Sequence, residues 1–330
     1  MYPLKFEPYL KTMVWGGEKI APFKGIDTDQ EKIGESWEIS AVEGHVSTIA
    51  NGPLKGKSLT EAIKEYGAGL VGKKVYGKFG EKFPLLVKFI DAKQDLSIQV
   101  HPDDALAAKR HPGMFGKTEM WYVVGADEGT SLLSGMSEEI TPDEYERRVL
   151  DNTITDVLAR HEIHEGDVYF LPAGRIHAIC RGAFVAEIQE TSDLTYRIYD
   201  YGRLGLDGKP RQLHVEEAKE AIDYKKYPSY KTEYAKVKDA ETTLVSCEHF
   251  TTTLYDLGKS FTKDLSGIDC FFIVMCVKGE GRIIDTESDG TVHELGIRQG
   301  ETILLPASSA KVEFIPGERG GMTCLGSRVD

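Results

Sequence analysis

The sequence lacks the signals of a secreted, membrane-bound or nucleic-acid-binding protein. Residues 1–17 contain no continuous apolar segment after a basic region, so we expect neither a signal peptide nor a membrane span. Lysine and arginine number 40 against 53 acidic residues, a formal net charge of −13 without a basic cluster, which argues against binding to nucleic acid or an anionic membrane. The five cysteines are odd in number and form no Cys-x-x-Cys motif, which favours reduced thiols in a cytoplasmic protein.

What is present is typical of a folded, mainly β protein. The chain has 330 residues, of which 41% are hydrophobic and 28% charged, so it is long enough for two domains. Short alternating or apolar runs separated by glycine turns predict strands over much of its length. Ser58-Leu59-Thr60-Glu61 has the pattern of a capping box and predicts a helix from Leu59 to about Tyr66.

One set of polar residues has the spacing of a metal site. Gln99 and His101 are two apart in a run rich in β-branched residues, so both side chains lie on one face of a strand. Glu119 opens a second apolar run, and His177 follows a turn that contains Pro172. Taken singly, each is more often a turn or surface residue. Together they offer a closed Gln/His/Glu/His metal shell.

The spacing around His177 resembles a motif of the cupins. Gly166, Pro172, Gly174 and His177 follow the second cupin motif, in which a tight turn and a returning strand deliver a histidine into a jelly-roll barrel. Gln99-x-His101 resembles the first motif with its first histidine replaced by glutamine. The resemblance implies a cupin-type jelly-roll β-barrel that contains the metal shell.

The second part of the chain repeats this pattern. Residues 272–281 resemble residues 120–129, and Gly300 and Pro306, with five residues between them, resemble Gly166 and Pro172. We therefore expect two cupin-type jelly-roll β-barrels: a catalytic domain over residues 1–235, with a helical insertion at about 137–160, and a degenerate domain over residues 236–330. Lys311 stands where His177 would be and Phe271 where Glu119 would be, so the second barrel is expected to hold no metal.

Two lysines near the predicted ligands leave alternatives open. Lys88 lies inside a buried apolar run, where it either extends to the surface or serves as a functional cation in the barrel. Lys117 precedes Glu119 by two residues and shares its side of a strand. It is either a plain partner of that carboxylate or a lysine for proton transfer, which needs burial or a nearby cation to lower its pKa.

These residues resemble the type I phosphomannose isomerases (mannose-6-phosphate isomerases) in their short bacterial form. The resemblance covers nearly the whole chain and is most specific in the segment 99–103 and in Lys117-x-Glu119. It implies one Zn²⁺ ion per chain, bound by Gln99, His101, Glu119 and His177. Longer members carry Lys-Pro-Glu where this chain has Lys117-Thr118-Glu119.

The same resemblance implies further site residues, named here together. Arg197 matches the active-site arginine of the family, with Asp193 four residues before it, and Ser97 matches a serine associated with the sugar phosphate; Lys88 and Arg203 match other cationic positions near that site. The implied substrate is therefore a small sugar phosphate.

The implied reaction interconverts mannose 6-phosphate and fructose 6-phosphate through a cis-enediol. We expect Arg197 to stabilise the enediolate, Lys117 to move a proton, and Arg203, Lys88 and Ser97 to hold the phosphate. Oligomeric state is left open as monomer or homodimer.

Two rival interpretations remain. The first is another metal-dependent cupin enzyme, such as an iron or manganese dioxygenase, although such sites more often use three histidines and one glutamate. The second is a non-catalytic regulatory cupin that binds a sugar phosphate. Lys117 and Arg197, together with the intact shell, favour chemistry over binding alone.

Overall fold

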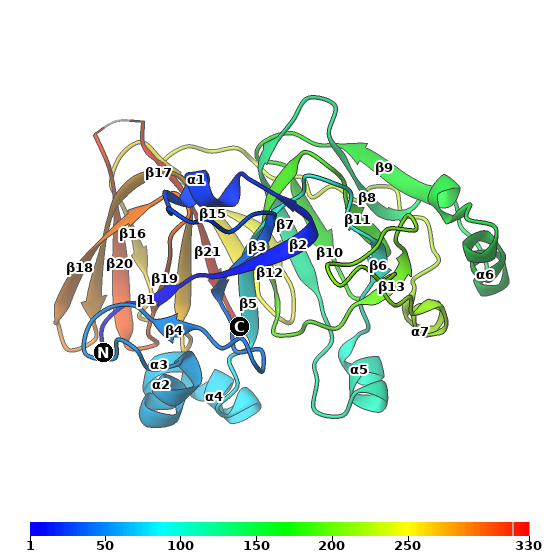
Figure 1. The fold of residues 1–330 in the computed structure, drawn as a ribbon. Coiled ribbons are helices and arrows are strands. Elements are labelled where there is room, and N and C mark those ends of the chain that lie inside the picture. Colours follow the sequence, from blue (N-terminus) through cyan, green and yellow to red (C-terminus); the bar gives the residue numbers. More distant parts are fainter. Residues whose placement is uncertain (319, 330) are drawn as a thin grey trace.

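The computed structural model describes residues 1–318 and 320–329, and in this part of the chain the strands form three antiparallel sheets (Figure 1). Sheet 1 contains, in spatial order, β10 (Val168–Leu171), β7 (Glu119–Ala126), β12 (Ala183–Glu190), β5 (Leu85–Asp91), β3 (Ile33–Ile39) and β2 (Tyr9–Gly17). Sheet 2 contains β13 (Tyr196–Tyr199), β6 (Ile98–Val100), β11 (His177–Ile179), β8 (Ser131–Met136) and β9 (Leu158–Glu162).

Sheet 3 is built mainly from the end of the chain. Its path runs through β14 (Glu241–Ser246), β15 (Thr251–Leu257), β21 (Met322–Arg328), β17 (Phe272–Glu287), β19 (Thr302–Leu305), β1 (Leu4–Glu7) and β4 (Thr48–Ile49). Off this path lie β16 (Phe261–Asp264), β18 (Val292–Arg298) and β20 (Ser309–Pro316). The first strand of the chain thus pairs with β19, and residues far apart in sequence complete one sheet.

The helices are short. They are α1 (Ile20–Lys24), α2 (Leu59–Tyr66), α3 (Ala68–Val71), α4 (Lys73–Phe79), α5 (Asp104–Arg110), α6 (Pro142–Leu150), α7 (Val215–Ala221) and the 3-10 helix η1 (Ile154–Val157). The predicted capping box is confirmed, because Ser58 and Glu61 bond each other's backbone N–H groups at the start of α2. Within the described residues no helix is both long and apolar enough to cross a membrane.

Sheet 1 is buried on both faces. Trp121 and Val185 on one face share an apolar cluster with Leu132 of sheet 2, whereas Phe89 on the other face packs in a cluster with Met275 of sheet 3. Every residue of β3, β5 and β12 is consequently buried. The strand period of two therefore sends alternate side chains of β5 into different layers.

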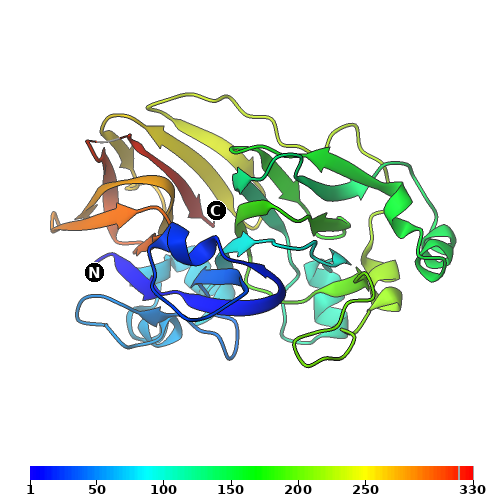
Figure 2. The same ribbon diagram turned by 45° about the horizontal axis from the view of Figure 1, so that its top comes forward.

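The outer layers complete the molecule. Sheet 2 turns its outer face to α6, α7 and η1, and Tyr145 of α6 is fully buried in that cluster. Both views place most of sheet 2 (green) and the strand β18 (orange) at opposite ends of an elongated molecule (Figure 1, Figure 2). The predicted ligands come from sheets 1 and 2 and the segment after β6, and His101, Glu119 and His177 are buried.

Candidate active site

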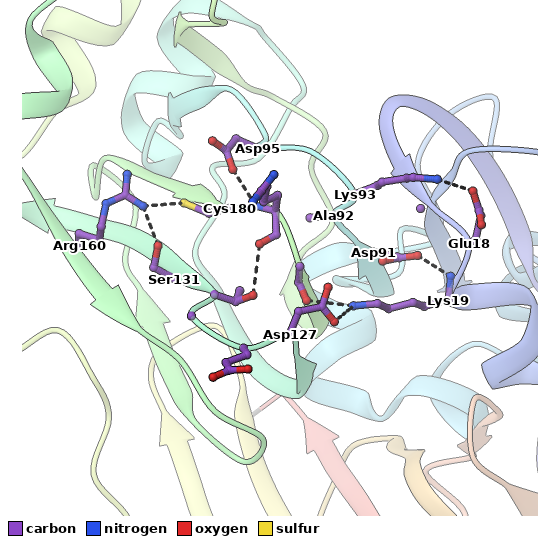
Figure 3. A pocket seen from close by; sticks show the side chains of 16 residues that line it. Glu18, Lys19, Asp91, Ala92, Lys93, Asp95, Asp127, Ser131, Arg160 and Cys180 are labelled. Carbon is purple, nitrogen blue, oxygen red and sulfur yellow. Dashed lines mark hydrogen bonds and ion pairs between the residues drawn. The ribbon is translucent and has the colours of Figure 1, made fainter.

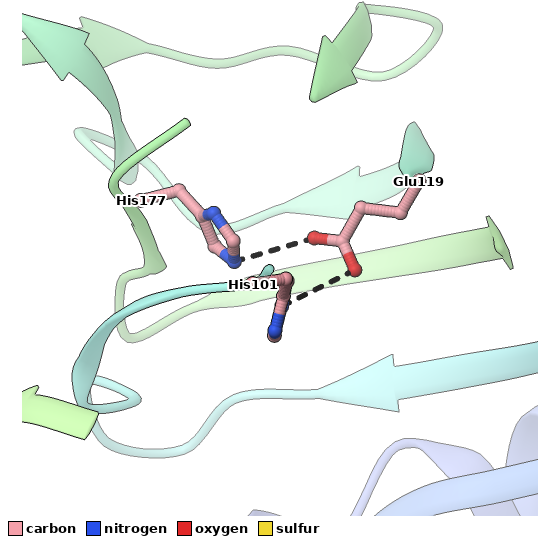
Figure 4. A group of neighbouring side chains, drawn as sticks. All are labelled: His101, Glu119 and His177. Carbon is pink, nitrogen blue, oxygen red and sulfur yellow. Dashed lines mark ion pairs between the residues drawn. The ribbon is translucent and has the colours of Figure 1, made fainter. Parts of the chain in front are cut away.

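The predicted metal ligands come from facing strands of two sheets. In sheet 2, Gln99 of β6 and His177 of β11 are direct cross-strand partners. Glu119 begins β7 in sheet 1, and His101 follows β6. The ligand atoms of His101, Glu119 and His177 all lie within 4.8 Å of one another (Figure 4). The Gln99 amide borders the same group, because its Nε2 lies 3.4 Å from His177 Nε2.

Both histidines are held with one particular ring nitrogen toward Glu119. The Nδ1 of His101 lies 2.7 Å from the carbonyl oxygen of Leu194, and the Nδ1 of His177 lies 2.7 Å from that of Arg175. Each Nδ1–H therefore donates to a carbonyl, which leaves the Nε2 lone pair toward the glutamate. The Nε2 atoms of His101 and His177 lie 3.6 Å and 3.3 Å from the Glu119 carboxylate.

The electrostatic surroundings keep these imidazoles neutral. Burial and the neighbouring Lys117 lower the pKa of His177 to about 3. The same two causes hold the pKa of His101 well below its usual value. A neutral imidazole is the form that binds a metal, so neither histidine needs to lose a proton near neutral pH.

A buried chain of opposite charges extends from this group across sheet 1. Lys117 Nζ contacts Glu119 Oε2 and lies 3.8 Å from Glu187 Oε1. Lys88 Nζ lies 2.9 Å from Glu187 Oε1 and 3.9 Å from Glu35 Oε2. Lys88 and Glu187 face each other directly because they are partners in the β5–β12 ladder. This buried row of side chains contains one more carboxylate than ammonium groups.

This arrangement shifts the pKa values of its members in different directions. Burial and Glu187 raise the pKa of Glu119. Burial alone would raise the pKa of Glu187, but Lys117 and Lys88 lower it overall. Burial alone would lower the pKa of Lys88, but Glu187 and Glu35 raise it instead. Glu119, next to the histidines, therefore takes up a proton at a higher pH than Glu187 does.

The donor set fits a divalent cation. Glu119 is fully buried, and its Oε1 has no hydrogen-bond partner among the described residues. A buried carboxylate oxygen without a donor is costly unless something positive satisfies it. The Nε2 atoms of His101 and His177 face the same carboxylate. Lys117 Nζ lies 3.0 Å from His101 Nε2. Nitrogen and carboxylate donors of this kind match the preferences of zinc.

A cavity of about 290 Å³ opens beside the ligand group. Its lining includes six of the residues predicted for the site, namely Lys88, Ser97, Gln99, Lys117, Asp193 and Arg197. His101, Glu119 and His177 lie behind this wall and are buried. The tryptophans Trp15, Trp37 and Trp121 supply apolar lining. The predicted ligands and cations therefore meet at one cavity.

Arg197 is placed at this cavity by the ladder of sheet 2. It pairs with Gln99 across the β13–β6 ladder. Its Nε donates to Ser97 Oγ at 3.3 Å and its Nη1 to the carbonyl of Gln212 at 2.9 Å. Burial lowers the pKa of the Arg197 guanidinium, but an arginine keeps its charge at neutral pH. A permanent cation therefore lies beside the Ser97 hydroxyl and the Gln99 amide.

Arg203 is the one predicted site residue outside both groups. Its guanidinium donates to Asp200 at 2.7 Å and to the carbonyl of Asp95 at 2.7 Å, and it is absent from the cavity lining. Arg211 lines the cavity instead and also binds Asp200, with Nε 2.7 Å from Oδ2. These two arginines keep the pKa of Asp200 low against the effect of burial.

Sequence reasoning missed Arg211 and the two carboxylates Glu35 and Glu187. Glu187 and Gln189 are two residues apart in β12, so they lie on one face of the strand. This period could have placed Glu187 on the same side as the ligands. Its partner Trp121 donates Nε1–H to Oε2 at 2.7 Å, a contact between strands that no local pattern announces. Arg211 carries no motif and reaches the cavity only through the path of the loop before α7.

A larger cavity of about 610 Å³ shares no lining residue with the one at the site, and some of its charges pair with one another (Figure 3). Lys19 pairs with Asp127 at 2.8 Å, and Lys93 pairs with Glu18. Asp91 accepts the backbone N–H of Lys19 at 2.6 Å. No histidine is present in this lining. The cavity therefore offers no donor group comparable to that around Glu119.

Comparison with known proteins points in one direction. The family model described as phosphomannose isomerase type I, catalytic domain, matches residues 4–123. The chain is 35% identical to the probable mannose-6-phosphate isomerase GmuF of Bacillus subtilis (strain 168), over 93% of this chain and 94% of that protein. It is 33% identical to the mannose-6-phosphate isomerase ManA of the same organism, over 92% of this chain and 93% of that protein.

A solved structure shares the whole architecture. The crystal structure of the mannose 6-phosphate isomerase from Bacillus subtilis superposes with a TM-score of 0.87 at 32% sequence identity, covering 99% of both chains. Similarity of sequence and of fold therefore extends through all three sheets.

Proposed function

The chain belongs to the type I phosphomannose isomerase family, and we propose that it is a zinc-dependent isomerase that interconverts mannose 6-phosphate and fructose 6-phosphate. The observation that carries the proposal is the convergence at one cavity of a metal-type donor group, Lys117 and Arg197. A cavity with only a sugar-binding role would need neither an unpartnered buried carboxylate oxygen nor a lysine held against the ligands.

The proposed cofactor is one Zn²⁺ ion per chain, held by Gln99, His101, Glu119 and His177. The neutral histidines and the unpartnered Glu119 Oε1 support this assignment. Gln99 would contribute its amide oxygen, which a half-turn of the amide exchanges with the Nε2 atom now facing His177. When bound, zinc supplies Lewis-acid polarisation of a substrate oxygen.

The proposed reaction moves one proton from carbon 2 to carbon 1 and a second proton from the oxygen on carbon 2 to the oxygen on carbon 1. Lys117 Nζ, in its neutral form, removes the proton from carbon 2 of the aldose and returns it to carbon 1, through a cis-enediol intermediate. The single lysine suffices because both carbons of a cis-enediol present the same face. Arg197 stabilises the negative oxygen of the enediolate, since it cannot give up its own proton. Asp193, exposed at the cavity, accepts hydrogen bonds from sugar hydroxyls.

The phosphate is proposed to bind beside Ser97. An overall charge of −13 opposes an anionic substrate, so local cations must provide the attraction. Arg211 lines the cavity with Arg197 and is therefore added to the phosphate site. Lys88 and Arg203 stay predictions for this role, and each already pairs with carboxylates, Lys88 with Glu187 and Arg203 with Asp200. Anchoring the phosphate would position the reacting carbons.

The finer description of the fold is also a proposal. We propose two cupin-type jelly-roll barrels, one over residues 1–235 with the helical insertion at about 137–160, and a metal-free one over residues 236–330. The grouping of sheets 1 and 2 within residues 9–199 supports the first barrel, and α6 and η1 lie between β8 and β9. The strands β1 and β4 nevertheless belong to sheet 3, so the early chain contributes to both units.

The deciding experiment is a coupled assay for fructose 6-phosphate formation from mannose 6-phosphate. The purified protein is measured as isolated, after chelation, and after zinc is restored. We expect activity that is lost with the metal and returns with zinc. Turnover that is absent in the zinc-loaded protein, while the sugar phosphate still binds, would instead support a regulatory role. Oxygen uptake with iron or manganese would support the dioxygenase interpretation.

A further inference from the structure

The segment Gly116–Glu119 carries two proposed site residues and is fastened through its backbone. Gly116 N–H donates to Asp104 Oδ1 at 2.8 Å, and Thr118 N–H donates to Glu190 Oε2 at 2.7 Å. The backbone N–H of Glu190 returns a bond to the Thr118 carbonyl at 3.1 Å. Because side chains alternate along a strand, Lys117 and Glu119 point to the site, whereas Thr118 points away from it. Glu190 thus holds this segment between its two functional side chains.

A residue from sheet 3 completes this fastening. His249 lies in the turn between β14 and β15, and its Nδ1 lies 2.9 Å from Glu190 Oε1. Its Nε2 lies 3.0 Å from Glu248 Oε1. Glu190 therefore uses one carboxylate oxygen for His249 and the other for the Thr118 backbone. The second half of the chain thus reaches the site segment through Glu190.

The charges around His249 favour its protonated form. Glu190, Glu248 and Asp104 face it, and the hydrogen bond to Glu190 raises the pKa of His249 against the effect of partial burial. A protonated imidazole donates from both nitrogens, which satisfies one carboxylate on each side. Glu190 is itself buried, so its charge needs such a partner.

We infer that His249 is a positioning residue for the isomerase reaction, acting through Glu190 on the backbone between Lys117 and Glu119. The inference rests on the proposed function, because it assumes that Lys117 transfers a proton and that Glu119 binds the metal. Without His249, Glu190 keeps a buried charge without a partner and turns toward other donors. The Thr118 N–H then loses its fixed acceptor, and both neighbouring side chains lose their alignment.

A metal interpretation of the same cluster is the competing outcome. The ligand atoms of Asp104, Glu190 and His249 lie within 4.8 Å of one another. Both Glu190 oxygens are already bonded, however, one to His249 and one to the Thr118 N–H, and Asp104 Oδ1 accepts the Gly116 N–H. We therefore favour the positioning role, and the metal content of the variants decides between the two.

The test compares His249→Ala with His249→Asn, whose amide nitrogen can still donate to Glu190 from nearly the position of Nδ1. The control is His164→Ala, which removes an exposed histidine that pairs with Glu162. For His249→Ala we expect kcat and zinc affinity each to fall about tenfold, the scale of losses for groups that orient ligands, with KM for mannose 6-phosphate changed less than about twofold. In His249→Asn, kcat and zinc affinity should both lie within about threefold of the parental values. His164→Ala should have the parental values.

Several results would overturn the inference. One is a His249→Ala variant with the kcat and zinc affinity of the parent. Another is an equal loss in His249→Ala and His249→Asn that parallels a lowered unfolding temperature. Loss of a second zinc equivalent per chain would assign the cluster to a cation instead. If His249→Ala does not fold, Glu190→Gln serves, because its amide oxygen still accepts from Thr118 but forms no ion pair. Zinc affinity, measured with a chromophoric chelator and no sugar, tests the positioning even if the parent does not turn over mannose 6-phosphate.

Discussion

The two halves of the chain share a sequence pattern but enclose different interiors. Between sheets 1 and 2 lie the ligand group and a buried chain of lysines and glutamates. In the second half, Phe271 stands at the position that corresponds by spacing to Glu119, is fully buried, and packs against Phe83 at a ring distance of 4.5 Å. Lys311, at the position of His177, is exposed on β20. A few inward positions thus decide whether such a layer holds polar chemistry or an apolar core.

This difference has an energetic side. Buried charges cost stability unless each has a partner, and sheet 1 supplies partners by placing Lys88 opposite Glu187 in adjacent strands. The second half buries mainly aromatic and aliphatic side chains, with Tyr255 stacked on Phe314 at 4.7 Å. It also buries two carboxylates of β17, Asp285 and Glu287, of which Glu287 pairs with the N-terminal ammonium group. Under the proposed function, the first half carries the reaction, and the second half contributes core and, by the inference drawn for His249, alignment.

The strongest way to test the contrast is to remove one ligand and its counterpart. His177→Ala should lower kcat by at least about a thousandfold, equivalent to about 4 kcal/mol of transition-state stabilisation, because one donor of a proposed closed shell is lost. Lys311→Ala should leave kcat and metal content unchanged. Steady-state kinetics and metal analysis of both variants check this. Substantial activity in His177→Ala, with one zinc still bound, would contradict the ligand assignment.

The apolar interior of the second half should respond in stability instead. Phe271→Ala should lower the free energy of unfolding by about 3 to 5 kcal/mol, because a fully buried phenyl ring is replaced by a cavity. Zinc affinity should stay at the parental value. Denaturant unfolding followed by circular dichroism measures the loss, and Val292→Ala, at an exposed position, is the control with less than about 0.5 kcal/mol. A weakened zinc affinity in Phe271→Ala would show that the two interiors are coupled.

Within the first half, the cation at the cavity should matter for rate more than for metal binding. Arg197→Ala should lower kcat about a hundredfold, about 2.7 kcal/mol, because the enediolate loses its permanent positive partner. Zinc affinity should be unchanged. Arg282→Ala, an exposed arginine of β17 paired with Glu294, is the matched control. A decrease of less than about tenfold in Arg197→Ala would make the stabilising role untenable.

The smallest predicted effect is a pH dependence found only in the half with the ligand group. Burial and Glu187 raise the pKa of Glu119, so the metal-free site takes up a proton at a pH where an ordinary glutamate is ionised. Metal binding must release that proton, and zinc affinity should therefore fall by up to about tenfold per pH unit as pH drops through the raised pKa. His101 and His177 do not contribute, because their pKa values are lowered.

Competition with a chelator between about pH 8 and about pH 5.5 measures this slope, above the ordinary glutamate pKa of about 4.3. In the metal-free protein, infrared spectroscopy should show a protonated carboxyl band that disappears in Glu119→Gln. An affinity independent of pH over this range, after correction for the chelator, would mean that Glu119 is ionised throughout.

Parts of the fold were predictable because they depend on near neighbours in the chain. The α2 helix follows from its capping box, in which Ser58 and Glu61 are three residues apart. The pairing of β1 with β19 was not predictable, since Leu4 meets Leu304 across nearly the whole chain. No local pattern distinguishes these partners from others of similar hydrophobicity.

The sequence by itself determined which residues are proposed as ligands, because Gln99-x-His101 and Lys117-x-Glu119 use the strand period of two, a local property of the backbone. Only the tertiary structure decided which other groups join them. Glu187 meets Lys88 through a strand register set over long distances, Arg211 rather than Arg203 lines the cavity, and His249 reaches Glu190 from another sheet. Such contacts depend on how whole layers pack, and layer packing is the summed result of many apolar contacts that no short segment encodes.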